Sequence, residues 1–208
     1  MGRIDHVVVG AHDLTGAAAF MLGRYGLEAQ RRWDHDGAGT ANMVIPIGDD
    51  QMIELLAVTD ASSQHPVANH LRPRVADGHR LYNVAIRPDD IDTTAERLGE
   101  PIFTMDNTSV DGCHMRWRVT GAIGMLSEEV LPFFVHCVEG REWVLGARPP
   151  EHRVEPDGIR WVEIGGDPRT IAAHLDDTSL PVRVTAGRPG LIAIGLALVD
   201  GDELEIRF

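Results

Sequence analysis

The chain has 208 residues, and its 32 acidic residues outnumber 19 basic residues, all of them arginine, to give a net charge of −13. Without lysine, the chain has no enzyme lysine for Schiff-base chemistry and no lysine for a phosphate-binding loop. The negative charge also argues against binding to duplex nucleic acid, which depends on cationic side chains. With 43% hydrophobic residues, the composition is typical of a globular protein that folds without disulfides or a structural metal.

The first residues carry no signal for export or for insertion into a membrane. The apolar run after Ile4 is short and is interrupted by His12 and Asp13, whereas a membrane span needs about 20 apolar residues. The two cysteines suit a reducing compartment. The sequence therefore predicts a cytoplasmic protein that does not enter the membrane.

Three segments repeat one pattern, and they begin at Ile4, Leu81 and Ile159, 77 and 78 residues apart. Each opens with an apolar, β-branched run of about six residues, which is typical of a buried strand. A turn with an aspartate follows, and then come apolar residues at helical spacing. The internal repeat indicates three related units.

An aspartate stands where each predicted helix begins. Asp13, Asp90 and Asp167 can each accept hydrogen bonds from the free N–H groups of the first helical turn. Three segments with strand character follow each helix. They are residues 27–35, 39–48 and 51–58 in the first unit, 101–106, 114–121 and 131–138 in the second, and 180–186, 191–200 and 203–208 in the third.

Polar, proline-bearing stretches at 59–78 and 146–158 separate the units, which we place at 1–60, 79–145 and 157–208. One four-stranded sheet with a single helix leaves a sheet face bare, so two units are expected to pair and cover it. The predicted fold class is α+β, with two paired βαβββ units that form a cup and a third related unit.

The opening IDHVVVGAHDL, the block GTANMVIPIGDDQMIELLAV and the segments RWRVTG and LPFFVHC resemble the vicinal oxygen chelate superfamily, and within it the glyoxalase-like domain proteins. This resemblance implies a cup that commonly holds a divalent metal, with ligands from the first and last strands of each unit. Ala41, Asn83, His136 and Cys137 depart from the residues usual in the family, which weakens the case for glyoxalase I activity in particular.

Equivalent strand positions offer His6, Glu54 and His136 as metal ligands, with Asn83 as a weak fourth. Two imidazoles and one carboxylate suit iron, manganese, nickel or zinc. Glu54 is the only charged residue in the strand 52–58, and a buried carboxylate must be paired, hydrogen-bonded or bound to a cation. Glu54 is also the candidate catalytic base. The expected substrate contacts are Asn83, Trp117 and Phe134.

Other interpretations of these residues stay open. Glu54 pairs with a buried arginine in one of them, and the two histidines are then ordinary core residues. A zinc site built from Cys113, His114, His136 and Cys137 lacks the paired spacing of such sites, and strand alternation puts Cys137 on the face opposite His136.

Three further features have a structural and a functional interpretation. His65 and His70, in the first connector, are surface residues or parts of a lid. Arg116 and Arg118 form salt bridges or clamp an anion. The third unit, with Trp161 and Glu205 where the first two carry ligand candidates, is structural and covers the cup or forms a dimer interface.

The leading functional prediction is a divalent-metal-dependent enzyme that acts on a small oxygenated substrate. The reaction is a lyase, isomerase or dioxygenase step through a metal-stabilised oxyanion. The alternative is a metal-free protein that binds or sequesters a small molecule in the same cup. Both predictions name a small molecule as the partner and allow a homodimer.

Overall fold

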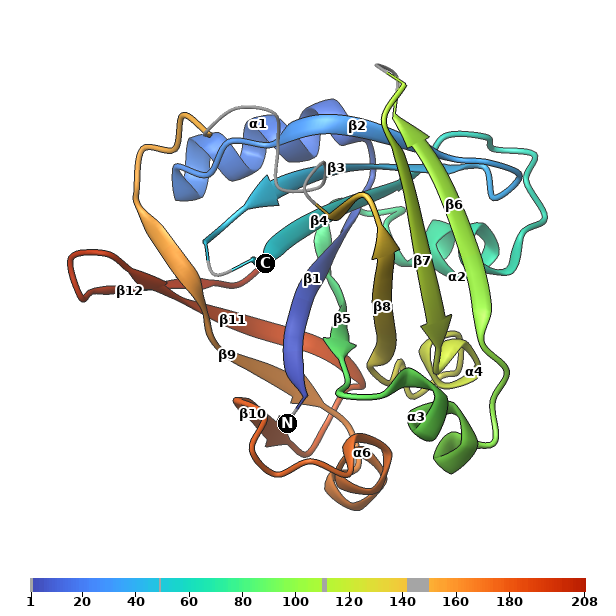
Figure 1. The fold of residues 1–208 in the computed structure, drawn as a ribbon. Helices are drawn as coiled ribbons and strands as arrows, with labels where there is room; N and C mark the ends of the chain where they lie inside the picture. Colours follow the sequence, from blue (N-terminus) through green and yellow to red (C-terminus); the bar gives the residue numbers. More distant parts are fainter. Residues whose placement is uncertain (1, 49, 110–111, 142–149) are drawn as a thin grey trace.

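The computed structural model describes residues 2–48, 50–109, 112–141 and 150–208, and its first two units join in one closed barrel (Figure 1). The first unit consists of β1 (Arg3–Ala11), α1 (Leu14–Tyr25), β2 (Gln30–His35), β3 (Thr40–Pro46) and β4 (Met52–Val58). The second consists of β5 (Arg80–Arg87), α3 (Ile91–Leu98), β6 (Phe103–Ser109), β7 (His114–Thr120), the short α4 (Ala122–Met125) and β8 (Phe133–Glu139).

The strand order around the barrel is β1-β4-β3-β2-β6-β7-β8-β5. Each unit contributes four neighbouring strands, in which the first strand runs parallel to the last, β1 to β4 and β5 to β8. The units join through two antiparallel pairs, β1 with β5 and β2 with β6. The predicted α+β fold with two paired βαβββ units is confirmed.

The helix starts follow the predicted chemistry. The Asp13 carboxylate accepts from the N–H of Gly16 at 2.6 Å. The Asp90 carboxylate accepts from the N–H of Asp92 at 2.8 Å, and Asp167 accepts from the N–H of Thr170 at 2.8 Å. Each aspartate therefore caps its helix, as the repeat predicts.

The first connector contains a helix, α2 (Pro66–Arg74), and Pro66 is its first residue. Proline is tolerated there because the first N–H groups of a helix have no partner within the helix. Leu71 and Val75 pack with Val8 and Leu56. The connector thus closes one end of the barrel, which the sequence left open as a surface segment or a lid.

The third unit has the predicted order of elements, namely β9 (Pro156–Gly165), α6 (Pro168–Leu175), β10 (Val182–Thr185), β11 (Gly190–Leu198) and β12 (Glu203–Ile206). Its sheet order is β10-β9-β11-β12. The first strand therefore pairs with the second and third strands, whereas in the barrel units it pairs with the fourth. The same order of elements along the chain has produced a different sheet.

The third sheet lies outside the barrel, where β11 contacts β5 (Figure 1). Its apolar side chains, such as Val162 and Ile194, join the core made by α1 and the outer wall of the barrel, including Val7 and Ile53. A second core lines the barrel interior. Its buried members are Trp33, Val44, Met52, Ala85, Met115, Trp117, Val119 and Val135. No helix in the described part of the chain is long and apolar enough to cross a membrane.

Replacing Gly195 with alanine is expected to lower the free energy of unfolding by about 1–3 kcal/mol, as overpacking in a filled site does. Gly195 lies opposite Trp161 in the register of β11 and β9, and an added Cβ would lie 2.2 Å from the indole Nε1. The matched control is Gly23→Ala in α1, where a Cβ meets no atom within 4 Å, and helix propensity predicts a gain of up to about 1 kcal/mol. Urea unfolding of both variants gives the comparison, and an unchanged stability of Gly195→Ala would contradict the packing described.

Candidate functional site

The site begins at an irregularity in β1. Ile4 pairs with Ile86 and His6 pairs with Ala85, so Asp5 is the extra residue of a β-bulge. A bulge interrupts strand alternation and can re-aim a side chain. Both Asp5 and His6 are buried, and Asp5 Oδ1 lies 2.8 Å from His6 Nδ1. The imidazole is therefore held from one side by a buried carboxylate.

The other side of the imidazole faces Glu54 in β4. His6 Nε2 lies 3.6 Å from Glu54 Oε2. Asn42 in β3 donates from Nδ2 to Glu54 Oε1 at 2.5 Å. The carbonyl Oδ1 of Asn42 is buried and has no hydrogen-bond partner among the described residues, which is uncommon for a buried polar atom. His6 thus contacts Glu54, and Glu54 contacts Asn42, whose amide oxygen has no partner among the described residues.

Charged residues of the second unit surround Asp5. Arg87 lies 2.6 Å from Asp5 Oδ2 and Arg141 lies 2.9 Å from it. Burial opposes the charge on Asp5, but the hydrogen bond to His6 and the charges of His6, Arg141 and Arg87 outweigh it and hold the pKa of Asp5 well below its usual range. Asp50 binds the same two arginines, each at 2.8 Å. Asp5 is therefore a stable carboxylate beside His6.

Aromatic rings pack around His6 inside the barrel. The Trp117 ring centroid lies 6.3 Å from that of His6 and the Phe133 centroid lies 5.8 Å from it, both edge-on. The guanidinium of Arg141 lies 5.4 Å from the Trp117 ring centroid, within the range of a cation–π contact. The structure thus places Trp117, one of the predicted substrate contacts, beside the histidine.

His35 in β2 is a further residue near this site, and sequence reasoning did not select it. Its Nδ1 lies 2.9 Å from Thr40 Oγ1. Burial lowers the pKa of His35, while the charge of Glu54 acts in the opposite direction. The sequence could have indicated His35 through its position two residues after Trp33, because residues two apart in a strand lie on the same face.

The structure does not bring His136 to His6 and Glu54. His136 is exposed and pairs with Arg118 on β7. Val135 and Cys137, on either side of it, pack against the core inside the barrel. Because side chains alternate along a strand, an assignment that is off by one residue changes the face. Of the predicted ligand set His6, Glu54 and His136, the structure brings only His6 and Glu54 together.

Asn83 is buried, but its side chain is occupied by the backbone. Its Nδ2 donates to the carbonyl of Leu131 at 3.1 Å, and its Oδ1 accepts from the N–H of Val84 at 2.6 Å. These bonds use the amide for structure. Asn83 is therefore not free to act as a ligand or as a substrate contact in this conformation.

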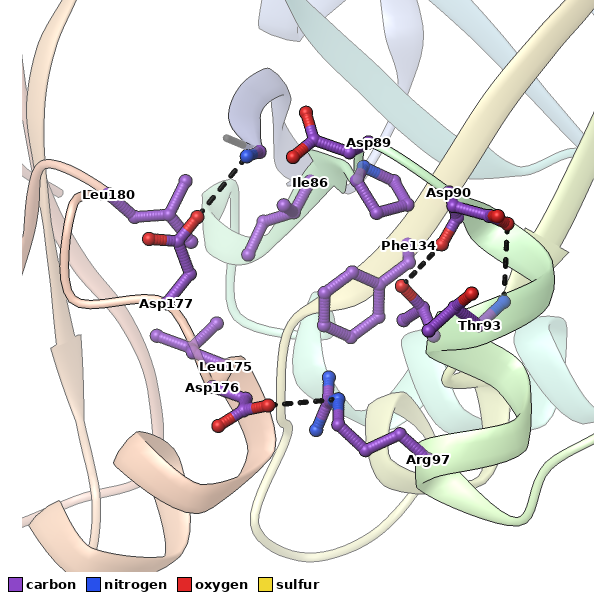
Figure 2. Close-up of a pocket in the computed structure, with 13 residues that line it drawn as sticks. Ile86, Asp89, Asp90, Thr93, Arg97, Phe134, Leu175, Asp176, Asp177 and Leu180 are labelled. Carbon is purple, nitrogen blue, oxygen red and sulfur yellow. Dashed lines mark hydrogen bonds and ion pairs between the residues drawn. The ribbon is translucent and has the colours of Figure 1, made fainter.

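Phe134, the third predicted substrate contact, faces away from the barrel interior. It lines a cleft of about 250 Å³ between α3 and the segment after α6, and Figure 2 shows its ring between Ile86 and Arg97. The Arg97 guanidinium lies 5.9 Å from the ring centroid, and the His174 ring lies 5.5 Å from it. Its neighbour Phe133 takes the place beside His6.

The structure bears on two of the open alternatives, namely the roles of Arg116 and Arg118 and the zinc site with the two cysteines. Arg116 binds Asp106 at 2.8 Å and Arg118 binds Asp92 at 2.6 Å, so both arginines form salt bridges. Among the described residues, no three His, Cys, Asp or Glu side chains cluster closely enough to hold a metal ion. Cys113, His114, His136 and Cys137, for which the sequence argued against a zinc site, form no such cluster in this part of the chain.

The comparisons with known proteins agree with this architecture. The family model described as "Glyoxalase-like domain" matches residues 4–178, which span the whole barrel and reach past α6. The chain belongs to the glyoxalase-like domain family, in the vicinal oxygen chelate superfamily that its sequence resembles. No match was found among curated proteins.

Solved structures with a similar fold include methylmalonyl-CoA epimerases. A variant from Streptomyces coelicolor, in complex with 2-nitronate-propionyl-CoA, is 20% identical, with a TM-score of 0.49 and coverage of 66% of this chain and 96% of that chain. The enzyme from Mycobacterium tuberculosis is 21% identical, with a TM-score of 0.47 and coverage of 64% and 85%. In both cases the aligned part is about two thirds of this chain.

Proposed function

We propose that this protein is a divalent-metal-dependent enzyme that acts on a small oxygenated substrate inside the barrel. The observation that carries the proposal is the pair formed by His6 Nε2 and Glu54 Oε2, 3.6 Å apart and buried. With its proton on Nδ1 towards Asp5, the neutral ring of His6 presents a lone pair on Nε2. A lone pair and a carboxylate oxygen that face each other at this distance attract a cation.

Two protein donors face each other across a gap that a divalent ion can fill, and Asn42 beside Glu54 offers a candidate for a third. His6 Nε2 and Glu54 Oε2 can span one ion at ligand distances of about 2.1 Å. The unfilled carbonyl of Asn42 would be the third donor, because its buried oxygen has no partner in the described chain. Nitrogen and oxygen donors of this kind suit iron, manganese, nickel or zinc.

A bound metal would supply a Lewis acid that stabilises an oxyanion on the substrate, consistent with a lyase, isomerase or dioxygenase reaction. The chain itself would supply the proton transfer. Glu54 is held by Asn42 through Oε1, so Oε2 would have to leave the metal before it could take or return a proton. Trp117 and Phe133 exclude water around His6 and offer apolar surface to the substrate.

A metal-free binding protein is the second candidate. The observation that favours it is the small number of charged ligands, since the described His, Cys, Asp and Glu residues provide no cluster of three for a metal. The aromatic rings of Trp33, Trp117 and Phe133 would then line a site for an apolar molecule.

Metal titration separates the two candidates. Calorimetry with Mn²⁺, Ni²⁺ and Zn²⁺ should show one site per chain in the wild type. His6→Ala and Glu54→Gln should each weaken binding by about 100-fold or more, since the loss of a ligand costs more than the 10–100-fold typical of residues that support a ligand. The matched control is His136→Ala, which removes an exposed histidine and should bind like the wild type.

Two results would count against a metal-dependent enzyme with His6 and Glu54 as ligands. One is a wild type that binds none of the three ions, which favours the metal-free candidate. The other is His136→Ala losing affinity as strongly as His6→Ala, which would restore the ligand set predicted from the sequence.

A further inference from the structure

We infer that Asp5 is the positioning residue of the site and that Arg87 and Arg141 of the second unit hold it in place. The inference deepens the proposed function and rests on it, since it assigns how His6 is prepared for a ligand. It concerns orientation and tautomer, so Asp5 itself touches neither metal nor substrate.

The first step is the tautomer of His6. A carboxylate accepts hydrogen bonds and donates none, so the 2.8 Å contact between Asp5 Oδ1 and His6 Nδ1 requires a proton on Nδ1. In the neutral ring the lone pair then lies on Nε2, the nitrogen that faces Glu54. Histidine ligands of metals are commonly oriented by a carboxylate in this manner.

The second step is the fixing of Asp5. The bulge turns its carboxylate into the protein, where it is fully buried. Arg141 donates to Oδ1 at 3.0 Å, and Arg87 donates from Nε to Oδ2 at 2.8 Å. Two charged donors and the imidazole therefore occupy both oxygens and leave the carboxylate one orientation.

The third step is the origin of the arginines. Arg87 ends β5 and Arg141 follows β8, so both belong to the second unit, whereas Asp5 and His6 belong to the first. The second unit offers no metal ligand at the two positions that face the site. The Asn83 amide is hydrogen-bonded to the backbone, and the side chain of β8 that points inward is the apolar Val135. The contribution of the second unit to the site is therefore the pair of guanidinium groups that orient Asp5.

The tautomer of His6 can be read directly by NMR on the metal-free protein. Long-range ¹H–¹⁵N spectra at mildly alkaline pH should show His6 with its proton on Nδ1, and the His6→Gln variant assigns the signal. Asp5→Ala should move the proton to Nε2, which is the usual preference of a free imidazole. Asp50→Ala is the control, because Asp50 binds Arg87 and Arg141 but has no contact with His6 among the hydrogen bonds and ion pairs of the described chain.

Two outcomes would overturn the inference. One is an Asp5→Ala protein in which His6 keeps its proton on Nδ1, and the other is a control Asp50→Ala that moves the proton as far as Asp5→Ala does. If Asp5→Ala does not fold, Asp5→Asn keeps the volume, and its weaker carbonyl acceptor should give a mixture of both tautomers. A single Nδ1–H tautomer in Asp5→Asn would also overturn the inference.

Measurements of metal affinity distinguish a failure of this inference from a failure of the proposed function. Asp5→Ala should bind Zn²⁺ about 10–100-fold more weakly than the wild type, while Asp50→Ala should bind it unchanged. A wild type that binds no metal sinks the proposed function, and the tautomer measurement still decides the role of Asp5. A wild type that binds Zn²⁺ with an Asp5→Ala variant of equal affinity overturns the inference alone.

Discussion

Replacing Arg87 with methionine should lower the free energy of unfolding by about 3 kcal/mol, because it removes one partner of a fully buried carboxylate. Asp5 is 0% exposed and lies 2.6 Å from Arg87. Methionine keeps much of the apolar stem of arginine and removes the charge. Arg141 would remain beside Asp5, which limits the loss to the lower part of the range for broken buried pairs. Urea unfolding at neutral pH measures the change.

The matched control is Arg3→Met. Arg3 binds Asp50 at 2.6 Å, but both side chains are more than a third exposed, at 39% and 35%. Exposed ion pairs contribute less than about 1 kcal/mol. Equal losses for Arg87→Met and Arg3→Met would show that the buried carboxylate contributes nothing particular to the stability of the barrel.

The loss in Arg87→Met should also depend on pH in a defined direction. The pKa of Asp5 in the folded protein lies below its unfolded value, which is about 3.9. The stability that the charged Asp5 contributes is therefore fully present above about pH 4 and disappears as the pH falls towards the folded pKa. The difference between wild type and Arg87→Met should be constant near neutral pH and shrink in acid.

The neighbours Phe133 and Phe134 should lose stability to different degrees when each is replaced with alanine. Phe134→Ala is expected to lower the free energy of unfolding by about 3–5 kcal/mol, as the loss of a buried phenylalanine does. Phe134 is 2% exposed and belongs to the core that joins the barrel to the third unit. Phe133 is only partly buried, so Phe133→Ala should cost less.

The second measurement for this pair is the His6 ring signal in NMR spectra. The Phe133 ring centroid lies 5.8 Å from that of His6, so Phe133→Ala should shift the His6 ring protons. Phe134 faces the cleft with Arg97 instead (Figure 2), and Phe134→Ala should leave them in place. A His6 signal that moves only in Phe134→Ala would mean that the two faces of β8 are assigned the wrong way round.

Much of the fold follows from patterns that are local in the chain. The strands and helices of the repeat lie where apolar periodicity and the aspartate caps Asp13, Asp90 and Asp167 predict them. The family resemblance predicts that two units close into one structure, and the barrel confirms it. The different sheet order of the third unit was not predictable, because the order of elements does not determine which strands pair.

The predictions for individual site residues depended on knowing the face of each strand. His6 in β1 and Glu54 in β4 lie together because the face assumed for each of these two strands is the one that the structure has. In β8 the assumed register was off by one residue, which exchanged Val135 for His136 and Phe133 for Phe134. Along a strand such a shift inverts every assignment.

The sequence by itself determined the repeat, the helix caps and the presence of His6 and Glu54 in apolar strands, since each depends on neighbouring residues. Only the tertiary structure decided that a bulge turns Asp5 towards His6. It also decided that Arg87 and Arg141, from 82 and 136 positions away, meet at that carboxylate. Contacts of this kind depend on strand pairing and on the closure of the barrel, and no local pattern in the chain encodes them.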